Sequence, residues 1–319
     1  MAVHSILTKS DINHILEKYD VGKLLKFEGI KEGIENTNYL ITTDINKYIL
    51  TIFENRVKKN DLPFYFQLMQ NTYDKNINCP TVLSRIDQHK TFDINKKKAA
   101  IFKFLKGKCL KTWTENNCYD VGKVLAKFHK GSYQAIKKKR NNFGVKCWED
   151  LYNKCFKKID FILPNSQYTI LKEIKYLKNK WKTAKLPKGL IHADLFPDNV
   201  LFNNGKISGI IDFYFSCYDF LIYDLAILLN AWAFKNNKLN KQNFFSILKG
   251  YETHRKLSCQ EKKMLNIFLR GASVRFLMTR VYDKLNVKKN SNVIIKDPNE
   301  YFIKLKFHQS IDSFDAYGK

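Results

Sequence analysis

Short runs in which apolar and polar residues alternate dominate the first hundred residues, and this pattern predicts an antiparallel β-sheet. Two helices are also predicted in this part of the chain. One follows a cap at Ser10 or Asp11 and runs to about Tyr19, and the other begins at Asp61-Leu62-Pro63, where proline suits a first helical turn, and runs to about residue 74. The predicted strands lie at 24–30, 38–42, 48–53, 82–86 and 99–105.

Beyond residue 115 the apolar spacing changes to three or four residues, which is typical of amphipathic helices. We place a boundary near residue 106, at Lys106-Gly107, between a small N-terminal lobe (1–106) and a larger, mainly helical lobe (107–319). The predicted fold class is therefore α+β with two lobes. The predicted helices lie at 115–130, 148–162, 168–181, 223–234, 243–251, 262–283 and 298–314.

One stretch of the second lobe, LIHADLFPDNVLFNNGKISGIID, carries the strongest chemical signal. Asp194 is followed five residues later by Asn199 and eighteen residues later by Asp212. Strands at 200–202 and 207–211, joined by the turn Asn203-Asn204-Gly205, bring the last two together. Phosphoryl transfer needs a carboxylate that receives the acceptor's proton and oxygen ligands that hold Mg²⁺ on the nucleotide phosphates. The spacing therefore predicts Asp194 as the base and Asn199 and Asp212 as magnesium ligands.

The loop between the first two strands is a candidate for contacts with ATP phosphates. Backbone N–H groups near Gly33 and side chains of Asn36, Thr37 and Asn38 offer hydrogen-bond donors there. One glycine does not make a glycine-rich phosphate loop, so a plain hairpin loop is the alternative interpretation.

The net charge of +26 does not by itself indicate a protein that binds nucleic acid or a membrane. Of the 56 basic residues, 49 are lysine and seven are arginine, the residue that reads phosphates and base edges bidentately. We interpret the charge as a compositional bias and expect neither nucleic-acid binding nor membrane association. Seven widely spaced cysteines and an N-terminus without an apolar signal run predict a cytoplasmic protein with reduced thiols.

The segments HADLFPDN, IDF and YDLA resemble the aminoglycoside phosphotransferase and choline kinase-like superfamily, whose fold is bilobal and protein kinase-like. Its homoserine kinase family is more similar still, through EGIENTNYLI, KYILTIFENRV, LIHADLFPDNV and IDFYFSCYDFLIYDLAILLNAW. The resemblance implies phosphorylation of the homoserine side-chain hydroxyl by ATP with Mg²⁺, in threonine biosynthesis. It also implies that His192 and Asp224 support the catalytic loop.

The chain departs from the superfamily at the third strand, where a cation that contacts the nucleotide is expected near Thr51. Its glutamate partner is also missing near 64–66, so the ion pair is absent as a unit. Arg56 and Lys58 are candidate replacements. An inactive, pseudokinase-like protein is an alternative.

Homoserine carries a carboxylate, for which an arginine fork is the suitable partner. Arg275 and Arg280 lie five residues apart on a predicted helix, roughly 140° around its axis, so only one of them faces any given site. Interhelix salt bridges are the alternative role for both. Other small hydroxylated amines, such as choline or an aminoglycoside, remain alternative substrates, and a nucleic-acid-binding module is the alternative from another class. The sequence leaves the oligomeric state open.

Overall fold

The computed structural model describes residues 5–30, 36–54, 57–131, 136–286 and 295–318. Two predicted nucleotide contacts, Gly33 and Arg56, lie outside these residues. The described chain forms two compact units, one ending at Lys106 and the other beginning at Gly107.

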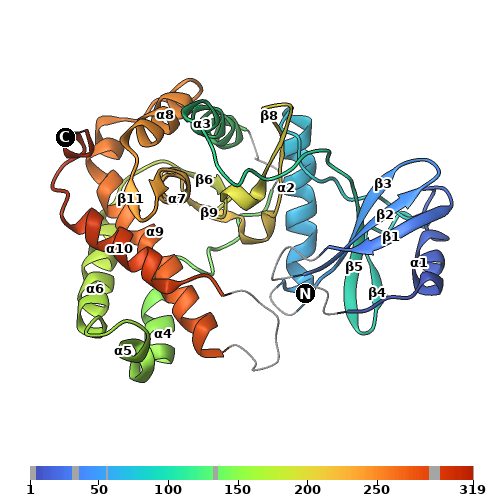
Figure 1. Cartoon of the computed structure of the whole chain (residues 1–319), viewed down its shortest axis with the longest axis horizontal. Helices are drawn as coiled ribbons and strands as arrows, with labels where there is room; N and C mark the ends of the chain where they lie inside the picture. Colours follow the sequence, from blue (N-terminus) through green and yellow to red (C-terminus); the bar gives the residue numbers. More distant parts are fainter. Residues whose placement is uncertain (1–4, 31–35, 55–56, 132–135, 287–294, 319) are drawn as a thin grey trace. The chain divides into compact units, whose positions relative to one another are not determined.

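The first unit is built on a five-stranded antiparallel sheet in the order β1-β2-β3-β5-β4 (Figure 1). The register places Leu50 between Tyr39 on one neighbouring strand and Ile101 on the other. The strands are β1 (Leu24–Gly29), β2 (Thr37–Thr43), β3 (Lys47–Ile52), β4 (Phe92–Ile94) and β5 (Lys97–Lys103), and the helices are α1 (Lys9–Leu16) and α2 (Leu62–Asp74).

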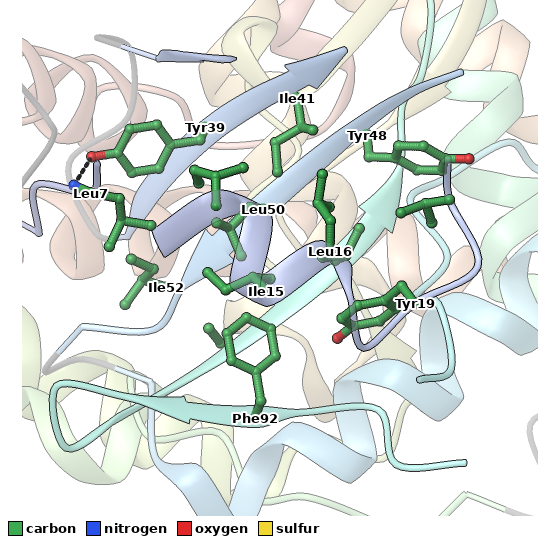
Figure 2. Close-up of a cluster of buried hydrophobic side chains, with 14 residues drawn as sticks. Leu7, Ile15, Leu16, Tyr19, Tyr39, Ile41, Tyr48, Leu50, Ile52 and Phe92 are labelled. Carbon is green, nitrogen blue, oxygen red and sulfur yellow. Dashed lines mark hydrogen bonds between the residues drawn. The ribbon is translucent and has the colours of Figure 1, made fainter. Parts of the chain in front are cut away.

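Helix α1 covers one face of this sheet and closes a hydrophobic core (Figure 2). Thr8 caps the helix in a capping box with Asp11, which satisfies donors that the first helical turn leaves free. Ile15 and Leu16 then point toward buried Leu50 and the neighbouring strand residues. The strict alternation of burial along β2 explains why the period-two pattern predicted that strand correctly.

The predicted strand at 82–86 is wrong. Only Val82 forms a bridge, to Phe102, and the next ladder-like bond runs from the Leu83 N–H to the Ile101 carbonyl at 2.8 Å. The apolar side chain of Ile86, 66% exposed, does not belong to a buried face. The short strand β4 forms this edge of the sheet instead. It was not predicted, because the sequence around it is rich in lysine.

The second unit is mainly helical, with three short two-stranded sheets. The predicted single helix at 148–162 is in fact two helices, α4 (Val145–Cys155) and the four-residue α5 (Ile159–Ile162), separated by a 3-10 turn. The last helix ends earlier than predicted, at Gln309. The helices are α3 (Glu115–Lys130), α4 (Val145–Cys155), α5 (Ile159–Ile162), α6 (Gln167–Thr183), α7 (Leu221–Trp232), α8 (Lys241–Glu252), α9 (Cys259–Asn286) and α10 (Pro298–Gln309).

The strand pairs position the loops of the second unit. Their bounds are β6 (Lys188–Ile191) with β9 (Cys217–Phe220), β7 (Val200–Asn203) with β8 (Lys206–Ile210), and β10 (Phe234–Lys235) with β11 (Lys238–Leu239). The β7–β8 hairpin is confirmed as predicted, whereas β6 and β9, far apart in sequence, carry no local pairing signal.

Helices α3 and α8 approach closely enough that their backbones nearly touch. A Cβ added at Gly122 would lie 2.2 Å from the Ile247 carbonyl oxygen, and one at Gly250 would lie 1.9 Å from that of Tyr119. Only glycine fits at both positions. Among the described residues, no helix is both long and apolar enough to cross a membrane.

We expect Leu50→Ala to lower the free energy of unfolding by about 2–5 kcal/mol, because it opens a cavity at a fully buried position. The matched control is Leu25→Ala. Leu25 lies on β1 of the same sheet and is 65% exposed, so its replacement should change the free energy of unfolding by less than about 0.5 kcal/mol. Urea denaturation followed by circular dichroism measures both. Equal effects of the two substitutions would contradict the core assignment.

Candidate active site

A short loop after β6 carries Asp194, and the structure places Asn199 beside it. The Asn199 side-chain amide nitrogen donates to the Asp194 carboxylate at 3.0 Å and to the Asp194 backbone carbonyl at 2.7 Å. Because both partners are acceptors, the amide nitrogen must face them. This leaves the Asn199 amide oxygen available as a ligand.

Asp212 reaches the same place through the β7–β8 hairpin. Ile211, just before it, donates its backbone N–H to the Asn199 carbonyl at 3.0 Å. The Ile211 carbonyl accepts a bond from His192 at 3.1 Å. Backbone contacts on both sides of Ile211 therefore tie the Asp212 segment to the loop of Asp194. The structure thus places Asp194 and Asn199 in direct contact and ties Ile211, the residue before Asp212, to the same loop.

Asp224, buried in the first turn of α7, binds the backbone of the loop that carries Asp194. Its carboxylate accepts bonds from the backbone N–H groups of His192 at 2.7 Å and Ala193 at 2.8 Å. The imidazole of His129 donates a third bond at 3.0 Å. Burial by itself would raise the pKa of Asp224, but the bond from His129 and the backbone donors outweigh it and lower the pKa, so the carboxylate is charged.

His129 belongs to a chain of hydrogen bonds that links α3 to α8. Its Nδ1 accepts from the Tyr251 hydroxyl at 2.7 Å, and that hydroxyl accepts from Arg255 at 3.1 Å. Arg255 in turn pairs with Glu261 at 2.6 Å. We did not predict any of these residues from the sequence. The available signal was a histidine next to Phe128, on the buried face of an otherwise apolar helical stripe.

His192 contacts the backbone of the Asp194 loop and of Ile211. Its Nε2 donates to the Ile211 carbonyl, so its Nδ1 is unprotonated and accepts the Asp194 backbone N–H at 3.3 Å. Burial lowers the pKa of His192 to about 4, which keeps the ring neutral near pH 7.

Two residues in the loops have a backbone conformation that L-amino acids rarely adopt. Ala193 and Asp212 both have φ of +64°. Such a conformation costs on the order of 1–3 kcal/mol at a non-glycine residue and persists only where neighbouring contacts fix it. One strained residue directly precedes Asp194 and the other is Asp212 itself, so the strain coincides with the predicted chemistry.

The donor set fits Mg²⁺ bound mainly through nucleotide phosphates. Asn199 offers an amide oxygen and Asp212 a carboxylate, and Mg²⁺ in kinases takes one or two protein oxygens together with phosphates and water. Among the described residues, no group of three or more His, Cys, Asp or Glu side chains forms a metal cage. A site with two protein ligands, Asn199 and Asp212, and further oxygens from the nucleotide needs no such group.

The two arginines predicted as substrate contacts both have partners within the protein. Arg280 pairs with Glu300 at 2.6 Å and donates to the Asp297 carbonyl at 2.9 Å. Arg275 donates to the Ala193 carbonyl. These contacts match the interhelix role for Arg280 and a loop contact for Arg275, and a role of either in substrate binding stays a prediction.

In the first unit, the predicted phosphate contacts take part in the hydrogen bonding of the sheet. Asn38 accepts from the Thr51 hydroxyl at 2.7 Å, at the position where the superfamily has a cation. Asn36 accepts the Glu54 backbone N–H at 3.2 Å, and the Thr37 hydroxyl donates to the Glu54 carboxylate at 2.8 Å. Their roles in nucleotide binding stay predictions, and any such contact must use groups that these bonds leave available.

Buried neutral histidines give a pH dependence that the structure predicts directly. Burial lowers the pKa of His192 from 6.5 to about 4 and that of His308 to about 3. Since the folded-state pKa values lie below the unfolded value, the unfolded chain binds more protons below pH 6.5, and stability is lost as the pH falls toward 4. We expect a loss of about 2 kcal/mol per histidine between pH 7 and pH 5, measured by urea denaturation. Equal stability at the two pH values would contradict the buried, neutral state.

The whole chain is similar to known enzymes. Residues 26–248 match the Phosphotransferase enzyme family. A homoserine kinase of Sinorhizobium fredii is 39% identical over 319 residues, covering 100% of this chain and 98% of that protein. A homoserine kinase of Agrobacterium fabrum is 41% identical, covering 100% of this chain and 99% of that protein.

Solved structures with the same fold are more distant in sequence. An amicoumacin kinase in complex with AMP-PNP and Ca²⁺ has a TM-score of 0.72 at 15% identity, covering 98% of this chain and 94% of that one. A Plasmodium vivax ethanolamine kinase has a TM-score of 0.68 at 15% identity, covering 97% of this chain and 92% of that one. These likenesses confirm the α+β, kinase-like fold class. The match over residues 26–248 and the full-length identities near 40% establish that the chain belongs to the homoserine kinases of the phosphotransferase enzyme family.

Proposed function

We propose that the protein transfers the γ-phosphoryl group of ATP to the side-chain hydroxyl of L-homoserine, giving O-phospho-L-homoserine and ADP. The observation that carries the proposal is the network that joins Asp194, Asn199 and the Asp212 segment. It supplies a base and two metal ligands in a chain whose full-length relatives are named homoserine kinases.

Asp194 is the proposed base. It orients the homoserine hydroxyl and takes its proton as the hydroxyl oxygen bonds to the γ-phosphorus and the bond to the β–γ bridging oxygen breaks. ADP leaves with the electron pair of that bond. The bond from Asn199 fixes one carboxylate oxygen of Asp194, and Asp224 fixes the backbone on which Asp194 is carried.

Asn199 and Asp212 are the proposed magnesium ligands. When bound, Mg²⁺ neutralises charge that develops on the phosphate oxygens during transfer. The protein's contribution is to hold the amide oxygen and the carboxylate in place, through the hairpin register that pairs Val200 with Ile210.

The small unit is the proposed nucleotide-binding lobe, with contacts from the segment of Asn36, Thr37 and Asn38. The side chains of Thr37 and Asn36 are buried, at 0% and 6% exposure, so backbone groups are the more suitable phosphate donors there. At Thr51, where the resemblance predicts a cation, the structure has a neutral hydrogen bond to Asn38.

ATP and homoserine are the proposed partners, and the cytoplasm is the proposed compartment. None of the seven cysteines is in a disulfide, in accord with a reducing environment. Binding to nucleic acid is not part of the proposal, because the excess charge is carried almost entirely by lysine.

We expect homoserine-dependent ADP release that Asp194→Asn reduces by about 10²–10⁴-fold, because the amide cannot accept the hydroxyl proton. Asp198→Asn is the matched control. This aspartate lies in the same loop, 58% exposed and paired with Lys296 at the surface, and its loss should change kcat less than about threefold. A coupled assay with homoserine, choline and kanamycin measures both variants. Full activity of Asp194→Asn would rule out the assigned base, and release with choline or kanamycin alone would point to another substrate.

We expect Asp212→Asn to weaken the binding of Mg²⁺ through loss of a charged ligand, with the Mg²⁺ concentration needed for half-maximal rate rising about 10–100-fold. Titration of the rate with Mg²⁺ measures this, and circular dichroism checks that the fold is intact. An unchanged titration curve would remove Asp212 from the metal site.

A further inference from the structure

Arg275, in the middle of α9, is a buried arginine at the catalytic loop. Its side chain is 2% exposed, and its guanidinium donates to the backbone carbonyl of Ala193. The contact spans 82 residues of sequence, so no local pattern could have predicted it.

Aromatic rings surround the guanidinium. Its centre lies 4.4 Å from the ring centroid of Phe276, 5.4 Å from that of Phe215 and 5.6 Å from that of Phe143. Phe143 and Phe215 also pack against each other edge to face, with centroids 5.3 Å apart. Cation–π attraction offsets part of the cost of burying the charge. The rings also restrict the directions from which a substrate carboxylate could reach it.

The residue that Arg275 contacts is the strained one. Ala193 has its N–H held by Asp224 at 2.8 Å and its carbonyl held by Arg275. The same peptide group contains the backbone N–H of Asp194, which donates to His192. Asp224 and Arg275 thus fix both peptide groups of the residue immediately before the base.

We propose that Arg275 is a positioning residue, which sets the direction of Asp194 through the Ala193 carbonyl, and is not the arginine that receives the substrate's carboxylate. This inference rests on the proposed function only for its kinetic readout. The two roles separate in kinetics, because a lost carboxylate contact raises KM for homoserine whereas a displaced base lowers kcat.

The test is Arg275→Lys, with Arg270→Lys as the matched control. Arg270 lies on the same helix, pairs with Glu173 at 2.6 Å and covers the Tyr176 ring at 4.6 Å. It shares the ring contact, its side chain is 15% exposed, and it contacts Glu173 on α6 instead of the loop. Lysine keeps the charge but not the planar fork. For Arg275→Lys we expect kcat to fall about 10–100-fold with KM for homoserine changed less than about threefold. For Arg270→Lys we expect kcat within about threefold of wild type. A rise in KM at constant kcat in Arg275→Lys would overturn the proposal.

A substrate without the carboxylate sharpens the comparison. In 3-aminopropan-1-ol the carboxylate of homoserine is replaced by hydrogen. A positioning role predicts the same fold loss in kcat/KM on this alcohol as on homoserine. A carboxylate contact predicts that the loss disappears.

Hydrogen exchange gives a readout that needs no substrate, so it separates failure of this inference from failure of the proposed function. We expect amides in the segment 190–200 to exchange at least about tenfold faster in Arg275→Lys than in Arg270→Lys. Equal rates would overturn the proposal whatever the substrate is. Should Arg275→Lys not fold, Arg275→Met keeps an unbranched stem among the three rings and removes the donor to the Ala193 carbonyl, and it should lower kcat with little change in KM; an unchanged kcat would contradict the account.

Discussion

The hydrogen bonds of the buried Asp224 carboxylate are the interactions on which the candidate active site depends. A charge with no exposed surface is stable only if hydrogen bonds replace its water, and three donors do so here: two backbone N–H groups of the catalytic loop and the imidazole of His129. The same bonds that stabilise the charge hold Ala193 in its strained conformation. The loop is therefore fixed before substrate binds. The proposed base, Asp194, requires this because it must meet the substrate hydroxyl in one orientation.

The rest of the second unit supports that carboxylate. The contact of α3 with α8, possible only because Gly122 and Gly250 lack side chains, lets Tyr251 reach His129. Helix α9 contributes Arg275 from the other side of the loop. Burial keeps His192 neutral, so it works as a hydrogen-bonding group and not as a charge. The net charge of +26 is carried mostly by lysines that do not belong to this arrangement, in which charges are few.

The sequence was sufficient for the parts of the protein whose signal is local. The β7–β8 hairpin, the period-two strands and most helices follow from turn residues and apolar spacing, and the order of Asp194, Asn199 and Asp212 predicted the candidate site. The failures have physical reasons. Strands β6 and β9 pair over a long separation in the sequence, and Val82 forms a single bridge instead of a strand. His129 and Arg275 act through contacts 95 and 82 residues away, which residue spacing does not encode.

The central claim is that Asp194, Asn199 and Asp212 converge on one metal ion and one alcohol. The most direct measurement is a crystal structure with Mg²⁺, a non-hydrolysable ATP analogue and homoserine bound. The account predicts the homoserine hydroxyl at about 3 Å from an Asp194 carboxylate oxygen, and Mg²⁺ at about 2.1 Å from oxygens of Asn199 and Asp212. A homoserine hydroxyl oriented away from Asp194, or a metal ion held without either ligand, would contradict it.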